Sequence, residues 1–191
     1  MAAIVWKRSP DDFATRIDIE DLTGLLQRDV VVEMGTQAII LVDGRSEAGT
    51  LGPDRYKLRS HPMAEVLGRA QTRTALLVDI GAVRRRFRVE PRLARPMIAE
   101  LDIMVRLGDP IKFFINLMHG APHYTLTELE AYLQPVVRDA VREAVRGKQP
   151  DELCGDLALK RELATSITVH LDETQTTVGL KFEGVMALDF I

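Results

Sequence analysis

The sequence predicts an α+β fold, in which a twisted, mainly antiparallel sheet carries flanking helices. Residues 28–107 are rich in short β-branched and alternating runs, residues 109–171 carry helical spacing of apolar positions, and residues 176–190 alternate again. Strands therefore come first and a strand-helix-helix-strand unit follows, which is an α+β order. We expect an N-terminal segment over residues 1–27 and one domain over residues 28–191.

The β-rich part begins with two β-branched runs in "VVVEMGTQAIILVDG". Asp43-Gly44 closes the second run, and Asp-Gly after such a run indicates a hairpin, because glycine adopts a positive φ without steric cost. Gly52-Pro53 then turns the chain before Tyr56. These features predict a compact β-meander over residues 28–59.

Two further strands are predicted in "TALLVDI" and "VRRRFRVE", on either side of Gly81. Since side chains alternate along a strand, one face of the second strand carries Arg84, Arg86 and Arg88. Two interpretations stay open for this face. In the first, the face contacts an anion, a lipid headgroup or a nucleic acid, and the nearby Arg92 and Arg95 favour this interpretation. In the second, it is a solvated outer face paired with acids.

Helices are predicted after Gly108. Asp109 and Pro110 suit the N-cap and first position of a short helix that reaches Leu117. A loop follows, and a longer helix starts near Thr125 with an apolar stripe from Leu129 to Ala144. Pro135 lies in this stripe and should kink or divide the helix.

The last part of the chain predicts a second helix and a long strand. Asp156 suits the N-cap of a helix whose apolar side runs to Leu171. The terminal run then alternates, with one apolar face formed by Val178, Leu180, Phe182, Gly184, Met186 and Leu188.

Composition excludes several classes of function. The 191 residues carry a net charge of −3, so no overall field favours nucleic acid. The single cysteine, Cys154, excludes an intrachain disulfide and a multi-cysteine zinc site. Uncharged apolar windows are too short to span a bilayer.

Catalytic motifs are absent from the sequence. His119 and His123 have the i, i+4 spacing of helical zinc ligands, but Gly120 and Pro122 lie between them and no third ligand follows. There is no G-x-S-x-G and no phosphate-binding glycine motif. We therefore expect a protein that is not an enzyme and has no cofactor.

The stretches "PMIAELDIMVRLGDPIKFF", "TLTELEAYLQPVVRDAVREAVRG" and "TVGLKFEGVMALDFI" resemble the SPFH or band-seven superfamily of stomatin, prohibitin, flotillin and HflK/HflC. The early stretch "GTQAIILVDGRSEAGTLGPDRYKL" is most similar to its bacterial virion-core-like branch. The resemblance implies a prohibitin-homology-like fold. It also implies a non-enzymatic scaffold that assembles laterally with itself and organises membrane-associated partners.

The resemblance further implies a cytoplasmic protein, peripheral at the inner face of the plasma membrane, with anionic lipid as a further partner. The candidate contacts are the arginine face and the apolar N-terminal residues Ile4, Val5 and Trp6. Those three residues also suit an ordinary first strand, because so few apolar side chains bind a membrane weakly. The main alternative is a soluble assembly or protein-binding module, similar to the shoulder domain of vault particles.

No heptad tract follows the terminal strand, although members of the superfamily typically assemble through a long helical region there. We therefore expect these 191 residues alone to form a monomer or a weak oligomer, and a longer native chain to assemble.

Overall fold

The computed structural model describes residues 4–19, 28–42, 45–58 and 73–191. Its fold is α+β, with mostly antiparallel sheets, as predicted. The chain divides into two compact units: unit 1 contains Met1–Gly81 and Pro110–Leu126, and unit 2 contains Ala82–Asp109 and Thr127–Ile191.

This division differs from the expected boundary at residues 27 and 28. β1 (Ile4–Trp6) pairs in parallel with β3 (Arg28–Val32), and β2 (Asp12–Asp18) pairs with β7 (Arg73–Asp79). The first strands of the chain are therefore integral to unit 1, because they pair with strands beyond that boundary. Conversely, residues 28–191 are shared between both units.

Unit 1 contains two sheets. One has the order β1-β3-β6, where β6 is Arg55–Leu58. The other has the order β10-β2-β7-β4-β5, where β4 is Thr36–Val42, β5 is Arg45–Leu51 and β10 is His123–Thr125. Residues from both sheets share one buried cluster, formed by Trp6, Ile19, Val30, Val32, Ala38, Ala75 and Leu77.

The predicted meander over residues 28–59 is therefore wrong, since β3 and β6 lie in one sheet and β4 and β5 in the other. The reason is burial: Val30 and Val32 pack in the same cluster as Ala38 of β4, so the two runs face each other instead of extending one sheet. The Asp43-Gly44 turn lies outside the described residues, although Val42 and Arg45 on either side are paired.

Two short helices and β10 complete unit 1. The helix α3 (Pro110–Phe113) continues as the π-helix η1 (Phe114–Met118), which agrees with the helix expected to Leu117. Phe113 is buried and packs edge-on against Phe13 and Tyr124, with ring centroids 5.4 and 5.2 Å away. Tyr124 lies in a strand, β10, where a loop was expected, because this segment pairs with β2.

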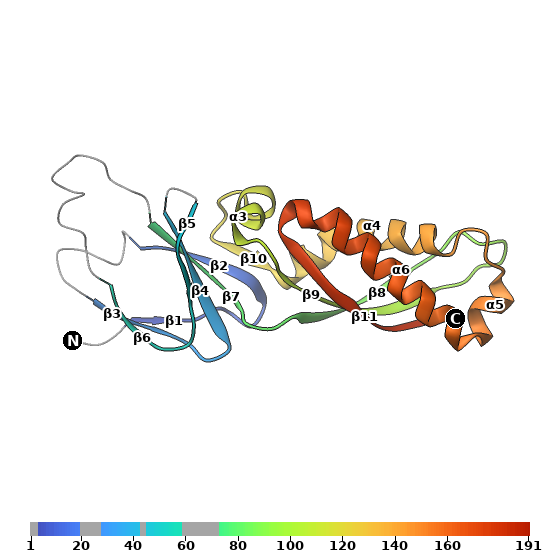
Figure 1. Cartoon of the computed structure of the whole chain (residues 1–191), viewed down its shortest axis with the longest axis horizontal. Coiled ribbons are helices and arrows are strands. Elements are labelled where there is room, and N and C mark those ends of the chain that lie inside the picture. The colour runs from blue at the N-terminus through green and yellow to red at the C-terminus, as the bar shows by residue number, and fades with distance from the viewer. Residues whose placement is uncertain (1–3, 20–27, 43–44, 59–72) are drawn as a thin grey trace. The chain divides into compact units, whose positions relative to one another are not determined.

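Unit 2 contains the antiparallel sheet β11-β9-β8, formed by Leu180–Phe190, Ala99–Leu107 and Val83–Val89. The helices α4 (Leu126–Ala144) and α6 (Leu157–Gln175) lie over this sheet (Figure 1). The short helix α5 (Pro150–Gly155) precedes α6, and the 3-10 helix η2 (Thr176–Val178) follows it.

The core of unit 2 lies between the sheet and the helices. One sheet face supplies buried apolar residues, including Phe87, Leu101, Ile103 and Phe190. The predicted stripe of α4 is confirmed, and α6 adds its own apolar side; the buried residues are Leu129, Leu133, Val137, Ala140 and Val141 of α4, and Leu163, Ile167 and Leu171 of α6.

Pro135 does not divide α4, which is one helix from Leu126 to Ala144. A proline removes the hydrogen bond to the carbonyl four residues earlier, here that of Ala131. Both Pro135 and Ala131 are exposed, so water can take the place of the missing donor.

The second helix and the terminal strand follow the prediction in part. The strand begins at Leu180 instead of residue 176, because residues 176–178 form η2 and Gly179 has a left-handed φ of 82°. Leu157, at the start of the predicted apolar side of the helix, is 62% exposed. The Asp156 carboxylate accepts hydrogen bonds from the backbone N–H groups of Ala158 and Leu159, so it is the N-cap of α6 as predicted. Met186, expected on the apolar face of the last strand, is 60% exposed. Register shifts at Phe182/Gly184 and Val185/Ala187 interrupt the alternation, which turns Met186 outward.

Candidate interaction surface

The face of the unit 2 sheet opposite α4 and α6 carries charged side chains, and we call it the open sheet face. It contains Arg84, Arg86 and Arg88 of β8, Glu100, Asp102 and Arg106 of β9, and Lys181, Glu183 and Asp189 of β11. The register explains this set: Arg86 pairs with Asp102, Arg88 with Glu100 and Arg106 with Lys181. Residues directly opposite each other in neighbouring strands point to the same face.

Asp102 is the centre of this surface. Its carboxylate is only 5% exposed and accepts hydrogen bonds from both Arg84 and Arg86, the latter at 2.9 and 3.2 Å. The Arg86 hydrogen bond, followed by that of Arg84, lowers the pKa of Asp102 from 3.8 to about 2, despite the opposing effect of burial. The pKa of Arg86 is raised in return, mainly by its hydrogen bond to Asp102. Asp102 is therefore ionised at neutral pH.

Most of the other charges of the open sheet face are also paired. Arg88 lies 2.9 Å from Glu100, and Arg106 lies 2.7 Å from Glu183. From α6, Lys160 reaches Asp189 at 2.9 Å. The surface therefore presents both signs of charge in fixed positions, rather than a uniformly basic patch.

The three predicted arginines lie together at the surface, with side chains 60, 68 and 63% exposed. Their geometry agrees with the interpretation of a solvated outer face paired with acids. Sequence reasoning did not identify Asp102 and Glu100 as the partners. The alternation of "AELDIMVRL" places both acids on one face of a strand, which was the available signal.

The N-terminal residues form the strand β1 in unit 1. Trp6 is only 1% exposed and belongs to the buried cluster with Val30 and Val32, whereas Val5 is 56% exposed. Trp6 is therefore not exposed for contact with a membrane in this structure, because its ring packs in the core of unit 1. Ile4 also packs against that cluster.

The two histidines of the predicted loop have different surroundings. His119 ends η1 with a left-handed φ of 48°, while Nδ1 of His123 lies 2.8 Å from the buried carboxylate of Asp12. Thr15 donates a further hydrogen bond to the same carboxylate. Within the described ranges, no group of three His, Cys, Asp or Glu side chains is placed to hold a metal ion.

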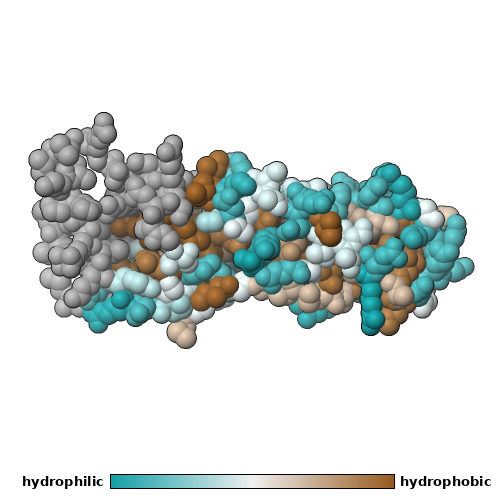
Figure 2. Space-filling view, viewed as in Figure 1, coloured by the Kyte–Doolittle hydropathy of each residue, from teal (hydrophilic) through white to brown (hydrophobic). Residues whose placement is uncertain are grey.

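The surface of unit 2 over α6 intersperses hydrophilic and apolar residues (Figure 2). Its large exposed apolar residues include Leu157 and Val169. Single exposed apolar residues are normal for a protein surface. In the part of the chain that the structure describes, none of the helices is both long and apolar enough to cross a membrane.

Comparison with models of known protein families and with curated proteins finds no match for this chain.

Proposed function

We propose that this chain is a non-enzymatic scaffold domain of the SPFH type, which assembles side by side with copies of itself and organises membrane-associated partners. The sequence resemblance and the α+β fold with helices on one sheet face both favour this proposal. The observation that carries it is the open sheet face, which unit 2 leaves uncovered and on which acids and bases hold fixed positions.

The mixed charge of this face suits contact with a second copy. Arg84, Arg86 and Arg88 line one edge strand of the sheet, whereas Asp189 lies on the other edge strand. An arrangement that brings the basic edge of one copy to the acidic positions of another is electrostatically favourable, and it disfavours other registers through like-charge contacts. Such contacts weaken as salt screens them.

The soluble alternative, an assembly or protein-binding module without membrane contact, is favoured by one specific observation. Trp6, the aromatic residue of the proposed N-terminal contact, is buried in unit 1. Removing it from that core would expose the residues of the cluster around it.

Two measurements test these proposals. Light scattering over a concentration series should detect association that weakens at high salt, and Arg88→Glu should reduce it at least several-fold. Arg161→Glu is the matched control, because this substitution changes the charge by the same amount on the exposed side of α6. Association that Arg88→Glu and Arg161→Glu alter equally would contradict the role of the open sheet face.

Sedimentation with vesicles separates the membrane-associated scaffold from the soluble module. The scaffold proposal expects the protein to sediment with vesicles rich in phosphatidylglycerol and not with phosphatidylcholine vesicles. Trp6, the single tryptophan, is a local probe. Sedimentation with unchanged Trp6 emission would assign the contact to a surface other than the N-terminal residues. Absence of sedimentation would favour the soluble module.

A further inference from the structure

A pocket of about 680 Å³ lies in unit 2, at the connection between β8 and β9. We call residues 90–98 the β8–β9 loop; together with Arg142 of α4 and Ile191 after β11, this loop lines the pocket. The volume is within the range of pockets that bind small molecules, roughly 300–1,000 Å³.

The loop has features that hold it in one conformation. Pro91 and Pro96 fix two of its φ angles. Its end is hydrogen-bonded to the terminal residue, since the N–H and carbonyl of Ile98 exchange bonds of 2.8 and 2.9 Å with Ile191. Pro91 and Met97 are buried. The pocket is therefore largely formed before any ligand arrives, which lowers the entropy cost of binding.

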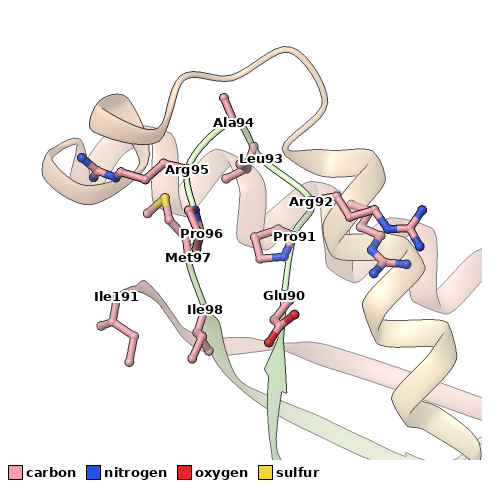
Figure 3. Close-up of a pocket in the computed structure, with 11 residues that line it drawn as sticks. Glu90, Pro91, Arg92, Leu93, Ala94, Arg95, Pro96, Met97, Ile98 and Ile191 are labelled. Atoms are coloured by element: carbon pink, nitrogen blue, oxygen red, sulfur yellow. The ribbon is translucent and has the colours of Figure 1, made fainter.

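The lining combines an apolar centre with flanking cations. Pro91 and Leu93 turn into the space between the two limbs of the loop, whereas Arg92 and Arg95 leave the loop in opposite directions (Figure 3). With Arg142 the lining has three arginines, against the single acid Glu90. This distribution fits a ligand that has an apolar part and a negatively charged group.

The three arginines differ in how far they are neutralised. Arg95 lies 3.4 Å from Asp151, whereas the Arg142 guanidinium has only a long contact of 3.9 Å to Asp139. The Nε of Arg142 is buried without a hydrogen-bond partner, and Arg92 forms no ion pair with any described residue. The Arg92 and Arg142 side of the pocket therefore has unused capacity to bind an oxyanion.

This contrasts with the arginines of the open sheet face. Arg84 and Arg86 both donate to one buried carboxylate, and Arg88 contacts Glu100. Displacing those partners with an external anion would leave Asp102 buried and unpaired, which is costly. Arginine guanidinium groups match the geometry of phosphate oxygens, so free guanidiniums favour that ligand class.

From these contacts we propose that the pocket under the β8–β9 loop binds a phosphate-bearing amphiphile, an anionic phospholipid, with the phosphate at Arg92 and Arg142 and the apolar part against Pro91 and Leu93. The proposal requires no self-assembly, so it goes beyond the scaffold function. Binding to a single, unassociated copy is sufficient.

Titration calorimetry with dihexanoyl phosphatidylglycerol, a short-chain lipid used below its micelle concentration, tests the proposal. We expect saturable binding that is at least about tenfold weaker in Arg92→Gln, because a charge-assisted hydrogen bond is lost. Arg161→Gln, on the exposed side of α6 and outside the residues that line the pocket, should retain the binding of the unaltered chain. Arg92 is exposed, so its replacement should leave the circular dichroism and the unfolding midpoint unchanged.

Two further ligands define what would overturn the proposal. Dihexanoyl phosphatidylcholine and inorganic phosphate should each bind at least several-fold more weakly, since one has no net charge and the other has no apolar part. Equal binding of phosphatidylcholine, or equal binding by Arg92→Gln, would exclude a site for anions at Arg92. Equal binding of inorganic phosphate would exclude the apolar contribution. Light scattering on the same samples measures self-association independently of lipid binding. It therefore distinguishes a failure of the scaffold proposal from a failure of the pocket proposal.

Discussion

The substitution Asp102→Asn tests the electrostatics of the open sheet face most sharply. The Asp102 carboxylate is 5% exposed and serves two guanidiniums, and its pKa is lowered to about 2. Because the folded-state pKa is depressed, the stabilisation is fully present above the ordinary value of 3.8 and is lost as the pH falls through about 2. The difference between the aspartate and asparagine proteins should therefore be largest at neutral pH.

The magnitude follows from the same pKa values. The interval between 3.8 and about 2, at about 1.4 kcal/mol per pH unit, corresponds to roughly 2.5 kcal/mol. Arg84 and Arg86 are more than half exposed, so solvent screening reduces this contribution, and we expect a loss of about 1 to 1.5 kcal/mol in the free energy of unfolding.

Urea unfolding followed by circular dichroism, between pH 7 and pH 2.5, measures this difference. Glu100→Gln is the matched control, because Glu100 is more exposed and pairs with Arg88 alone. It should cost about 0.5 kcal/mol or less, as surface ion pairs do. The reasoning is refuted if Asp102→Asn costs no more than Glu100→Gln at pH 7, or if the difference from the unaltered protein does not shrink in acid.

Three further tests address other parts of unit 2, each by measuring the free energy of unfolding. Asp156→Ala should cost about 1 kcal/mol through loss of the α6 N-cap, while Asp156→Asn should largely preserve it. Gly147→Ala should destabilise the protein by about 1 kcal/mol, because the φ angle of Gly147 is +77°. Gly155→Ala should be neutral or stabilising, because Gly155 lies at the end of α5 with open space around it. Equal effects of the two substitutions would contradict the argument from the φ angle. Leu133→Ala should cost about 2–5 kcal/mol, since Leu133 is fully buried, and a loss below about 1 kcal/mol would show that α4 does not pack as described.

Local features of unit 2 were predictable because their signals lie within a few residues. Asp156 caps the helix that begins at the next residue, and the period of two along residues 83–89 places three arginines on one face. The short helix α5 was missed, since six residues show no helical periodicity. The exposure of Met186 was missed too, because a β-bulge interrupts an alternation that the sequence alone continues.

The division into two units could not be predicted, because it depends on distant pairings. β2 finds both of its neighbours, β7 and β10, far along the chain, and β1 pairs with β3 across the expected boundary. Hydrophobic periodicity identifies a strand but not its partner. The burial of Trp6 has the same origin, since the strands that cover it lie elsewhere in the sequence.

The candidate surface was predictable in part. The alternation along β8 was sufficient to place Arg84, Arg86 and Arg88 together, but their neutralisation by Asp102 and Glu100 requires the register between β8 and β9. The pocket under the β8–β9 loop requires more still, because α4 and the residue after β11 contribute to it. Arg92 and Arg95 could be identified near the arginine face from the sequence, but the residues that surround them in the pocket could not.

Light scattering of the full native protein, over a concentration and salt series, tests the central proposal of a self-assembling scaffold most directly. We predict a mass well above that of one chain, which falls with increasing salt and falls further in Arg88→Glu than in Arg161→Glu. A mass of one chain at every concentration and salt would contradict the scaffold proposal and leave a simple binding module as the better account.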